Sequence, residues 1–237
     1  MGLNLTFAEL MKRSILLLML TSLTMQPSYA ESTKILQNSL IDIKALSPNI
    51  QLDMRYASTD NFTGHKVAGY LAAKCLLHRP VAEALKNVEQ HLQKSGYGLI
   101  IYDCYRPTIA VDDFMRWTKN ADISTKTEYY PDLDKSVLVP DYIAEKSGHS
   151  KGATVDLGLL DCRTKSCIAL DMGTEFDFFG AQANTDYPKL TDNQRHNRKQ
   201  LLKAMNEQGF ENYPMEWWHY TWKAGVLPDQ AYSFPIQ

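Results

Sequence analysis

Two short segments about sixty residues apart constrain this chain more than any other feature. Residues 147–156 read SGHSKGATVD, and residues 216–219 read EWWH. Together they supply His149, Asp156 and His219, a three-ligand set suited to a catalytic zinc ion with a fourth position open to water. A fold that uses this set must bring the two segments side by side.

Each segment also has an ordinary explanation when it is taken alone. A histidine on a strand is usually a packed or surface residue, and an aspartate near a glycine usually lies in a turn. The two segments together favour a metal site, because each supplies what the other lacks. The sequence therefore predicts one zinc ion per chain, bound by His149, Asp156 and His219.

Glu216 stands three residues before His219, where a carboxylate is suited to act as the base on the attacking water. In a regular strand the two side chains would point to opposite faces, because the side-chain period is two. Glu216 is therefore expected either to precede the strand or to lie beside a bulge, and Pro214 favours an irregular entry. The alternative is that Glu216 is a plain surface residue.

Arg106 is the leading candidate for a group that stabilises negative charge on the reacting oxygen. It follows a short apolar run at residues 99–102, and Pro107 restricts its backbone. Amide hydrolysis develops an oxyanion, and catalysis needs a positive or donor group aimed at that oxygen. On spacing alone, an ordinary surface salt bridge explains Arg106 equally well.

The N-terminus has the pattern of a secretory signal peptide. Lys12 and Arg13 form a basic region, residues 14–20 are mostly apolar, and residues 28–30 read SYA, a small-residue cleavage site. We expect residues 1–30 to be removed and the mature protein to be periplasmic. A retained anchor is the alternative, although the apolar run is short for a membrane span. Met11 is a possible alternative start.

Residues 31–237 are enough for one domain with a sizeable core. They contain no internal repeat, no low-complexity linker and no second long apolar segment, so we expect one soluble domain. The net charge is −2 and no basic run is present, which argues against a nucleic-acid partner.

All four cysteines lie in the mature part, and an even count in an oxidising compartment predicts disulfides. A zinc-thiolate site is the alternative, but no Cys-x-x-Cys pair is present. Cys162 and Cys167 flank a short polar turn and are expected to close a hairpin, which leaves Cys75 to pair with Cys104. Three pairings of four cysteines are formally possible, and we prefer this one because it gives one local disulfide and one that closes a longer loop.

Hydrophobic periodicity and breaker residues predict a mixture of strands and helices. The expected order is a strand at 50–56, a loop at 61–70, a helix from Pro80 to Gly96, a strand at 99–102, a helix at 108–117, a polar loop over the active face at 118–140, a strand at 153–160, a helix at 191–208 and a strand at 215–222. This order lacks a regular βαβ rhythm. It therefore indicates an α+β fold with a largely antiparallel sheet.

The residues of the two metal segments resemble those of the D-alanyl-D-alanine dipeptidases, zinc enzymes best known from vancomycin resistance. The resemblance extends over most of the mature chain and includes residues 56–64 (YASTDNFTG), 103–107 (DCYRP), 172–177 (MGTEFD) and 216–220 (EWWHY). Thr154 is a departure, because the family motif usually has alanine there. The segments that contain Tyr56, Arg106 and Asp177 favour this family over D,D-carboxypeptidases of the same fold.

The resemblance implies a single domain of the Hedgehog and D,D-peptidase type. It implies the zinc ligands named above, with Glu216 as the base and Arg106 as the oxyanion stabiliser. It also implies that Tyr56 and Asp177 help to hold the free ammonium group of D-Ala-D-Ala, and an anionic aspartate suits that group. Ser147 is a candidate contact for the carboxylate end.

Two other functions remain open at this point. The chain could be a D,D-carboxypeptidase that trims peptidoglycan stem peptides, since the zinc motif is shared. It could also be a non-catalytic, zinc-containing module that binds cell-wall peptides. Glu216 and Arg106 argue against such a module, because binding alone needs neither.

Overall fold

The computed structural model describes residues 39–237, and the predicted signal peptide at residues 1–30 lies outside this part of the chain. The strands are β1 (Leu40–Asp42), β2 (Gln51–Leu52), β3 (Leu76–His78), β4 (Tyr97–Asp103), β5 (Thr154–Asp161), β6 (Ile168–Ala169), β7 (Phe210–Asn212) and β8 (His219–Trp222). The α-helices are α3 (Arg79–Gln93), α4 (Thr108–Trp117), α5 (Lys126–Tyr129) and α6 (Asp192–Asn206), and the 3-10 helices are η1 (Ile43–Ala45), η2 (Arg55–Ala57), η3 (Lys135–Val137), η4 (Gly148–Lys151) and η5 (Ala181–Ala183). No helix within residues 39–237 has the length and apolar character needed to cross a membrane.

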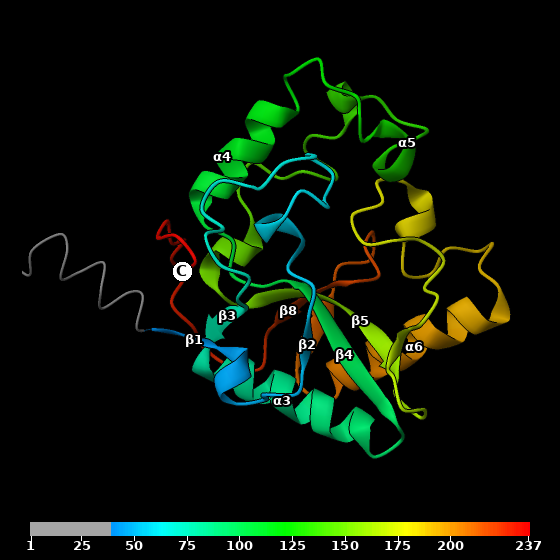
Figure 1. Ribbon diagram of the computed structural model, residues 1–237. Helices are drawn as coiled ribbons and strands as arrows, with labels where there is room; N and C mark the ends of the chain where they lie inside the picture. Colours follow the sequence, from blue (N-terminus) through cyan, green and yellow to red (C-terminus); the bar gives the residue numbers. More distant parts are fainter. Residues whose placement is uncertain (1–38) are drawn as a thin grey trace, which may run out of the picture. The chain divides into compact units, whose positions relative to one another are not determined.

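The main sheet has the strand order β2–β4–β5–β8–β7, and β6 adds to β5. β2 runs parallel to β4, and the other strand pairs are antiparallel. In Figure 1, α3 and α6 lie along the lower side of this sheet, whereas α4 and α5 lie above the end of β4. The predicted α+β class with a largely antiparallel sheet is confirmed.

The helix ends follow the local signals in the sequence. Pro80 occupies the first turn of α3, and Gly96 takes a left-handed conformation with φ 78° just beyond its end. α6 starts with a capping box, in which the Thr191 hydroxyl accepts from the Gln194 backbone N–H and the Gln194 side chain accepts from the Thr191 backbone N–H. α4 has the predicted bounds.

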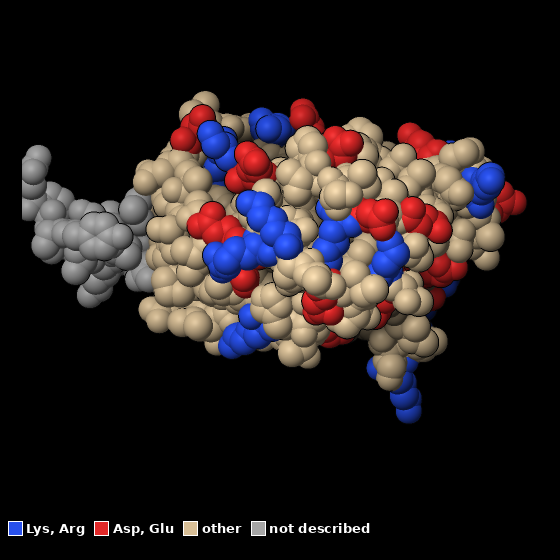
Figure 2. Space-filling view, turned by 90° about the horizontal axis from the view of Figure 1, so that it is seen from above, with Lys and Arg blue, Asp and Glu red and all other residues tan. Residues whose placement is uncertain are grey.

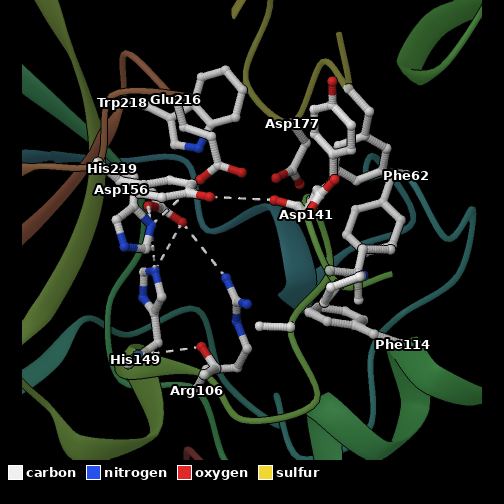
Figure 3. Close-up of a pocket in the computed structure, with 18 of the residues that line it drawn as sticks. Phe62, Arg106, Phe114, Asp141, His149, Asp156, Asp177, Glu216, Trp218 and His219 are labelled. Atoms are coloured by element: carbon white, nitrogen blue, oxygen red, sulfur yellow. Dashed lines mark hydrogen bonds and ion pairs between the residues drawn. The ribbon is translucent and has the colours of Figure 1, made fainter. Parts of the chain in front are cut away.

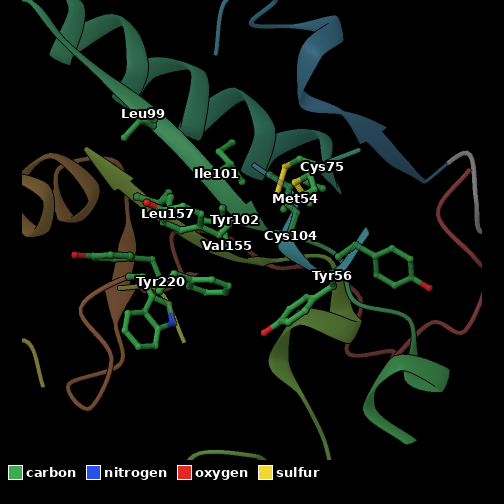
Figure 4. Close-up of a cluster of buried hydrophobic side chains, with 14 of the residues drawn as sticks. Met54, Tyr56, Cys75, Leu99, Ile101, Tyr102, Cys104, Val155, Leu157 and Tyr220 are labelled. Carbon is green, nitrogen blue, oxygen red and sulfur yellow. A yellow bond between two sulfur atoms is a disulfide. The ribbon is translucent and has the colours of Figure 1, made fainter. Parts of the chain in front are cut away.

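One face of the main sheet forms the core against α3. Leu99 and Ile101 on β4 and Val155 and Leu157 on β5 are all fully buried, and Figure 4 shows the two β4 side chains pointing towards α3. Each such side chain contributes about 1.5–3 kcal/mol by burial. Asp156 stands between Val155 and Leu157. Because side chains alternate along a strand, the Asp156 side chain points to the opposite face, where the candidate site lies.

Two predicted strands are shorter than expected. In residues 50–56 only β2 is extended, and η2 follows, with the Ala57 backbone N–H bonded to Met54 O. In residues 215–222 the strand starts only at His219. Pro214 has no backbone N–H, and the Glu216 N–H is used in a turn to Tyr213 O, so this stretch cannot join the ladder.

Both predicted disulfides, Cys75–Cys104 and Cys162–Cys167, are present. They close loops with sequence separations of 29 and 5 residues, respectively. The Cys75–Cys104 disulfide joins the residue before β3 to the turn after β4, two residues before Arg106.

Removal of the two disulfides is expected to have unequal effects. On the loop-entropy relation, loss of Cys75–Cys104 lowers the free energy of unfolding by about 3.5 kcal/mol and loss of Cys162–Cys167 by about 2 kcal/mol. Only the first pair holds the turn that carries Arg106, so paired Cys→Ala variants should differ in activity as well. Urea unfolding and rate measurements check this, and an equal loss of activity in both would contradict it.

Candidate active site

Strand register places three polar side chains, those of Asp103, Asp156 and His219, in one row across the sheet. Asp103 at the end of β4 pairs with Asp156 on β5, and Asp156 pairs with His219 at the start of β8. Directly opposed residues of antiparallel strands point to the same face. The ladder is irregular between Ile101 and Asp103, and this shift moves Asp103 into the row.

His149 reaches this row from η4 rather than from a strand. Ser147 caps η4 by accepting from the His149 backbone N–H, and Gly152 ends it in a left-handed conformation with φ 70°. The His149 Nδ1–H donates to the Cys104 carbonyl at 2.7 Å. This bond fixes the ring tautomer, so the lone pair of His149 Nε2 faces Asp156.

The three predicted ligands converge on one point, as Figure 3 shows. His149 Nε2 lies 3.3 Å from Asp156 Oδ2 and 3.3 Å from His219 Nδ1, and the latter lies 3.1 Å from Asp156 Oδ1. One ligand atom from each residue lies within 4.8 Å of the others, and Asp156 Oδ1 is buried without a hydrogen bond. Converging lone pairs of two imidazoles and a buried carboxylate fit a divalent cation such as zinc.

Asp156 is held in its anionic form. Burial alone would raise its pKa, but the His149 and His219 imidazoles outweigh burial and hold the pKa of this carboxyl well below its ordinary value. An anionic carboxylate is the form that binds metal.

Glu216 precedes β8, so its side chain is not bound by the strand alternation that would point it away from His219. The His219 backbone N–H donates to Glu216 O in a turn, and this turn brings Glu216 Oε2 to 3.5 Å from His219 Nδ1. Burial raises the pKa of the Glu216 carboxyl to about 7, against the opposing effect of His219. A carboxyl with this pKa can both accept and release a proton near neutral pH.

Arg106 is not a surface residue. Its Nε donates to Asp103 Oδ2 at 3.0 Å, and a terminal nitrogen lies 3.6 Å from Asp156 Oδ2. The guanidinium carbon lies 5.1 Å from the ring centres of both Tyr56 and Phe114. These contacts fix the guanidinium beside the predicted metal ligands, where its remaining N–H groups can face a substrate oxygen.

Tyr56 and Asp177 meet on the other side of the same cavity. The Tyr56 hydroxyl donates to Asp177 Oδ2 at 2.8 Å, and both residues are buried. Burial, together with the Asp156 carboxylate, raises the pKa of Asp177 well above its ordinary value. Within residues 39–237, Asp177 is the one non-glycine residue with positive φ, at 62°. Such an outlier is held in place by its surroundings and is common at functional sites.

The loop that carries Asp177 is fixed at both ends by a buried arginine. Arg198 on α6 donates from Nε to Met172 O at 2.6 Å and from its terminal nitrogens to Gln182 O and Asn184 O at 2.9 and 2.5 Å. Arg198 could not be recognised from the sequence, because a charged residue on an amphipathic helix is normally solvent-exposed.

A cavity of about 290 Å³ joins these groups. Its lining includes the three predicted ligands together with Tyr56, Arg106, Asp177, Glu216, Ser147, Trp218 and residues 140–144. The loop at 118–140, which was predicted to cover the active face, reaches the cavity only at Pro140. Residues 141–144, which follow this loop, also line the cavity. This volume is at the lower end for small-molecule sites, which indicates a small ligand.

Asp103 is a supporting residue that the sequence did not indicate. Asp103 is fully buried, accepts from the Tyr70 hydroxyl at 2.6 Å and lies 3.5 Å from His149 Nδ1, in addition to its bond with Arg106. The signal was present in the DCYRP segment, but a turn explained that aspartate equally well. The hydroxyl of Thr154, the departure from the family motif, bonds to the Thr221 hydroxyl across the strands at 3.0 Å.

Known proteins resemble this chain over most of its length. The peptidase M15 family model, described as D-ala-D-ala dipeptidase, matches residues 36–237. A D-alanyl-D-alanine dipeptidase of Enterococcus faecalis is 34% identical over 85% of this chain and 100% of the relative. One of Streptomyces coelicolor is 37% identical over 82% of this chain and 96% of the relative.

Among solved structures, a vancomycin-resistance D,D-pentapeptidase in complex with Zn(II) is 15% identical, covers 65% of this chain and 76% of its own, and has a TM-score of 0.39. This likeness is too low to support the fold or the site. The family match and the sequence relatives are sufficient: the chain belongs to the D-alanyl-D-alanine dipeptidase family of zinc metallopeptidases.

Proposed function

We propose that this protein hydrolyses the free dipeptide D-Ala-D-Ala in a zinc-dependent reaction. The observation that carries the proposal is one small cavity that joins the His149, Asp156 and His219 cluster and Glu216 to the buried Asp177 and Tyr56. A bound zinc ion would supply a Lewis acid that lowers the pKa of water and polarises the scissile carbonyl.

Glu216 is proposed to carry the proton. Its carboxylate accepts a proton from the attacking water and then donates it to the nitrogen of the leaving D-alanine. The burial that raises its pKa to about 7 makes both transfers feasible near neutral pH.

Arg106 is proposed to stabilise the oxygen that becomes negative when water attacks the amide. Asp103 and the two aromatic rings hold the guanidinium in place before the substrate arrives. A fixed donor is more effective than water, since it does not need to reorient as the charge develops.

The two ends of the dipeptide are proposed to bind to different residues. Asp177 receives the ammonium group, and Tyr56 fixes one of its oxygens and leaves the other free for the ligand. A cation at this place offsets the burial that raises the pKa of Asp177, so binding favours the anionic carboxylate. Ser147 uses its oxygen to cap η4, and its hydroxyl hydrogen can be donated to the substrate carboxylate.

Arg106→Ala is expected to keep the zinc and to lower kcat, with a barrier increase of about 2–4 kcal/mol, as for a lost oxyanion donor. Steady-state kinetics of the zinc-loaded variant check this. A change confined to KM would instead make Arg106 an anchor for the carboxylate.

The decisive experiment offers the purified, zinc-loaded enzyme free D-Ala-D-Ala beside a stem pentapeptide that ends in D-Ala-D-Ala. Cleavage of the dipeptide alone supports the proposal. Preferential cleavage of the pentapeptide makes the protein a D,D-carboxypeptidase, and binding without cleavage makes it a recognition module.

We further propose that the mature protein is periplasmic, based on the signal-peptide pattern in residues 1–30 and consistent with two disulfides. Cell fractionation with N-terminal sequencing tests this. The expected result is a periplasmic protein that starts at Glu31, and a cytoplasmic protein with its leader intact would contradict it.

A further inference from the structure

The side-chain amide of Asn212 joins the backbone of the proposed base to that of the second histidine ligand. Its Nδ2 donates to Glu216 O at 2.9 Å and to His219 O at 3.0 Å. Its Oδ1 accepts from the Thr185 hydroxyl at 2.6 Å. Both N–H groups and the oxygen are therefore used, and the three partners determine which end of the amide is nitrogen.

No other side chain of this size can make these bonds. A carboxylate has no hydrogen to donate and would place its charge against two carbonyl oxygens, whereas an apolar side chain would leave both carbonyls without this donor. Asn212 itself ends β7, where it pairs with Tyr220, so its position is set by the sheet and not by the turn that it holds.

The segment between Asn212 and His219 depends on such contacts because it is not part of a strand. Thr185, which lies outside this segment, also binds to it: the Thr185 backbone N–H donates to Pro214 O at 2.9 Å. Thr185 thus contacts the turn through its backbone and orients the Asn212 amide through its hydroxyl.

We infer that Asn212 is a positioning residue that sets the geometry between Glu216 and His219, with Thr185 as its partner. This inference rests on the proposed function only for its effect on turnover. The effect on the metal site follows from the hydrogen bond between Asn212 and the backbone carbonyl of His219, a proposed ligand. Mutation of residues that hold metal ligands in place commonly lowers metal affinity or activity by about 10- to 100-fold.

The test compares Asn212→Asp, which preserves the shape of the side chain, with two controls. Asn193→Asp makes the same chemical change at an exposed position in the first turn of α6. Phe210→Leu alters a buried residue of the same strand and lowers stability without touching the turn. Thr185→Val removes only the orienting hydroxyl and serves as the milder variant if Asn212→Asp does not fold.

Two readouts are used, well below the melting temperature of every variant. For Asn212→Asp we expect kcat for D-Ala-D-Ala to fall by about 10- to 100-fold, with KM within about threefold. We also expect the absorption bands of the cobalt-substituted protein to shift, because these bands report the arrangement of the ligands. Thr185→Val should change both in the same direction by less, and both controls should resemble wild type.

Wild-type kcat and an unshifted cobalt spectrum in Asn212→Asp would overturn the inference, as would losses no larger than those of Phe210→Leu at a matched melting temperature. The cobalt spectrum needs no substrate. If wild-type protein does not cleave D-Ala-D-Ala but the Asn212→Asp spectrum shifts, the proposed function fails and the positioning role stands.

Discussion

Glu216→Gln is expected to keep the fold and the zinc ion and to lose turnover of D-Ala-D-Ala by about 10³-fold or more. General acid–base groups contribute about 10²–10⁴ to the rate, and here one carboxylate is proposed to serve both proton transfers. The glutamine has nearly the same shape, so it preserves the packing of a side chain that is only 12% exposed. Metal analysis and steady-state kinetics are the measurements.

Glu211→Gln is the matched control for this prediction. Glu211 lies on β7 and is exposed, so the same change there removes a carboxylate that faces solvent. A Glu216→Gln enzyme within about tenfold of wild type, about 1.4 kcal/mol in barrier, would show that the base lies elsewhere.

His149→Ala is expected to lose most of its zinc and all useful activity. The change removes one of the three proposed ligands and leaves the buried Asp156 carboxylate with only one of its two imidazole neighbours, His219. Metal affinity depends on a complete ligand set, so the loss should appear as a low zinc-to-protein ratio after dialysis.

The control replaces a histidine that takes no part in the site. His196 lies on α6 and is exposed, and His196→Ala should retain full zinc and full rate. A His149→Ala protein with wild-type zinc content would remove His149 from the ligand set.

Regular elements with strong local signals were predictable from the sequence. The apolar face of α3, the capping box at Thr191 and the bounds of α4 each follow from neighbours along the chain. The predictions failed where a strand is shorter than the hydrophobic pattern: β2 ends early and β8 starts late. In both places the pattern continues through residues whose backbone bonds are used in turns.

The residues of the proposed site also fall into those that could be predicted from the sequence and those that could not. The three ligands, Glu216 and both disulfide pairings could be named from residue type and spacing. Asp103, Arg198 and Asn212 could not, because each acts on partners that are distant in sequence or belong to the backbone. Arg198 illustrates this most clearly: its three acceptors are main-chain carbonyls, which any residue type can provide.

The chemical groups available to this protein follow from its residues alone: two imidazoles, two carboxylates and a guanidinium, in segments that resemble one family. Whether these groups meet depends on the tertiary fold. A shift in the β4–β5 ladder and the β5–β8 register align Asp103, Asp156 and His219, and the turn held by Asn212 rotates Glu216 to their side. Register is set by pairing between distant strands, and a slip of one residue would point each side chain to the other face.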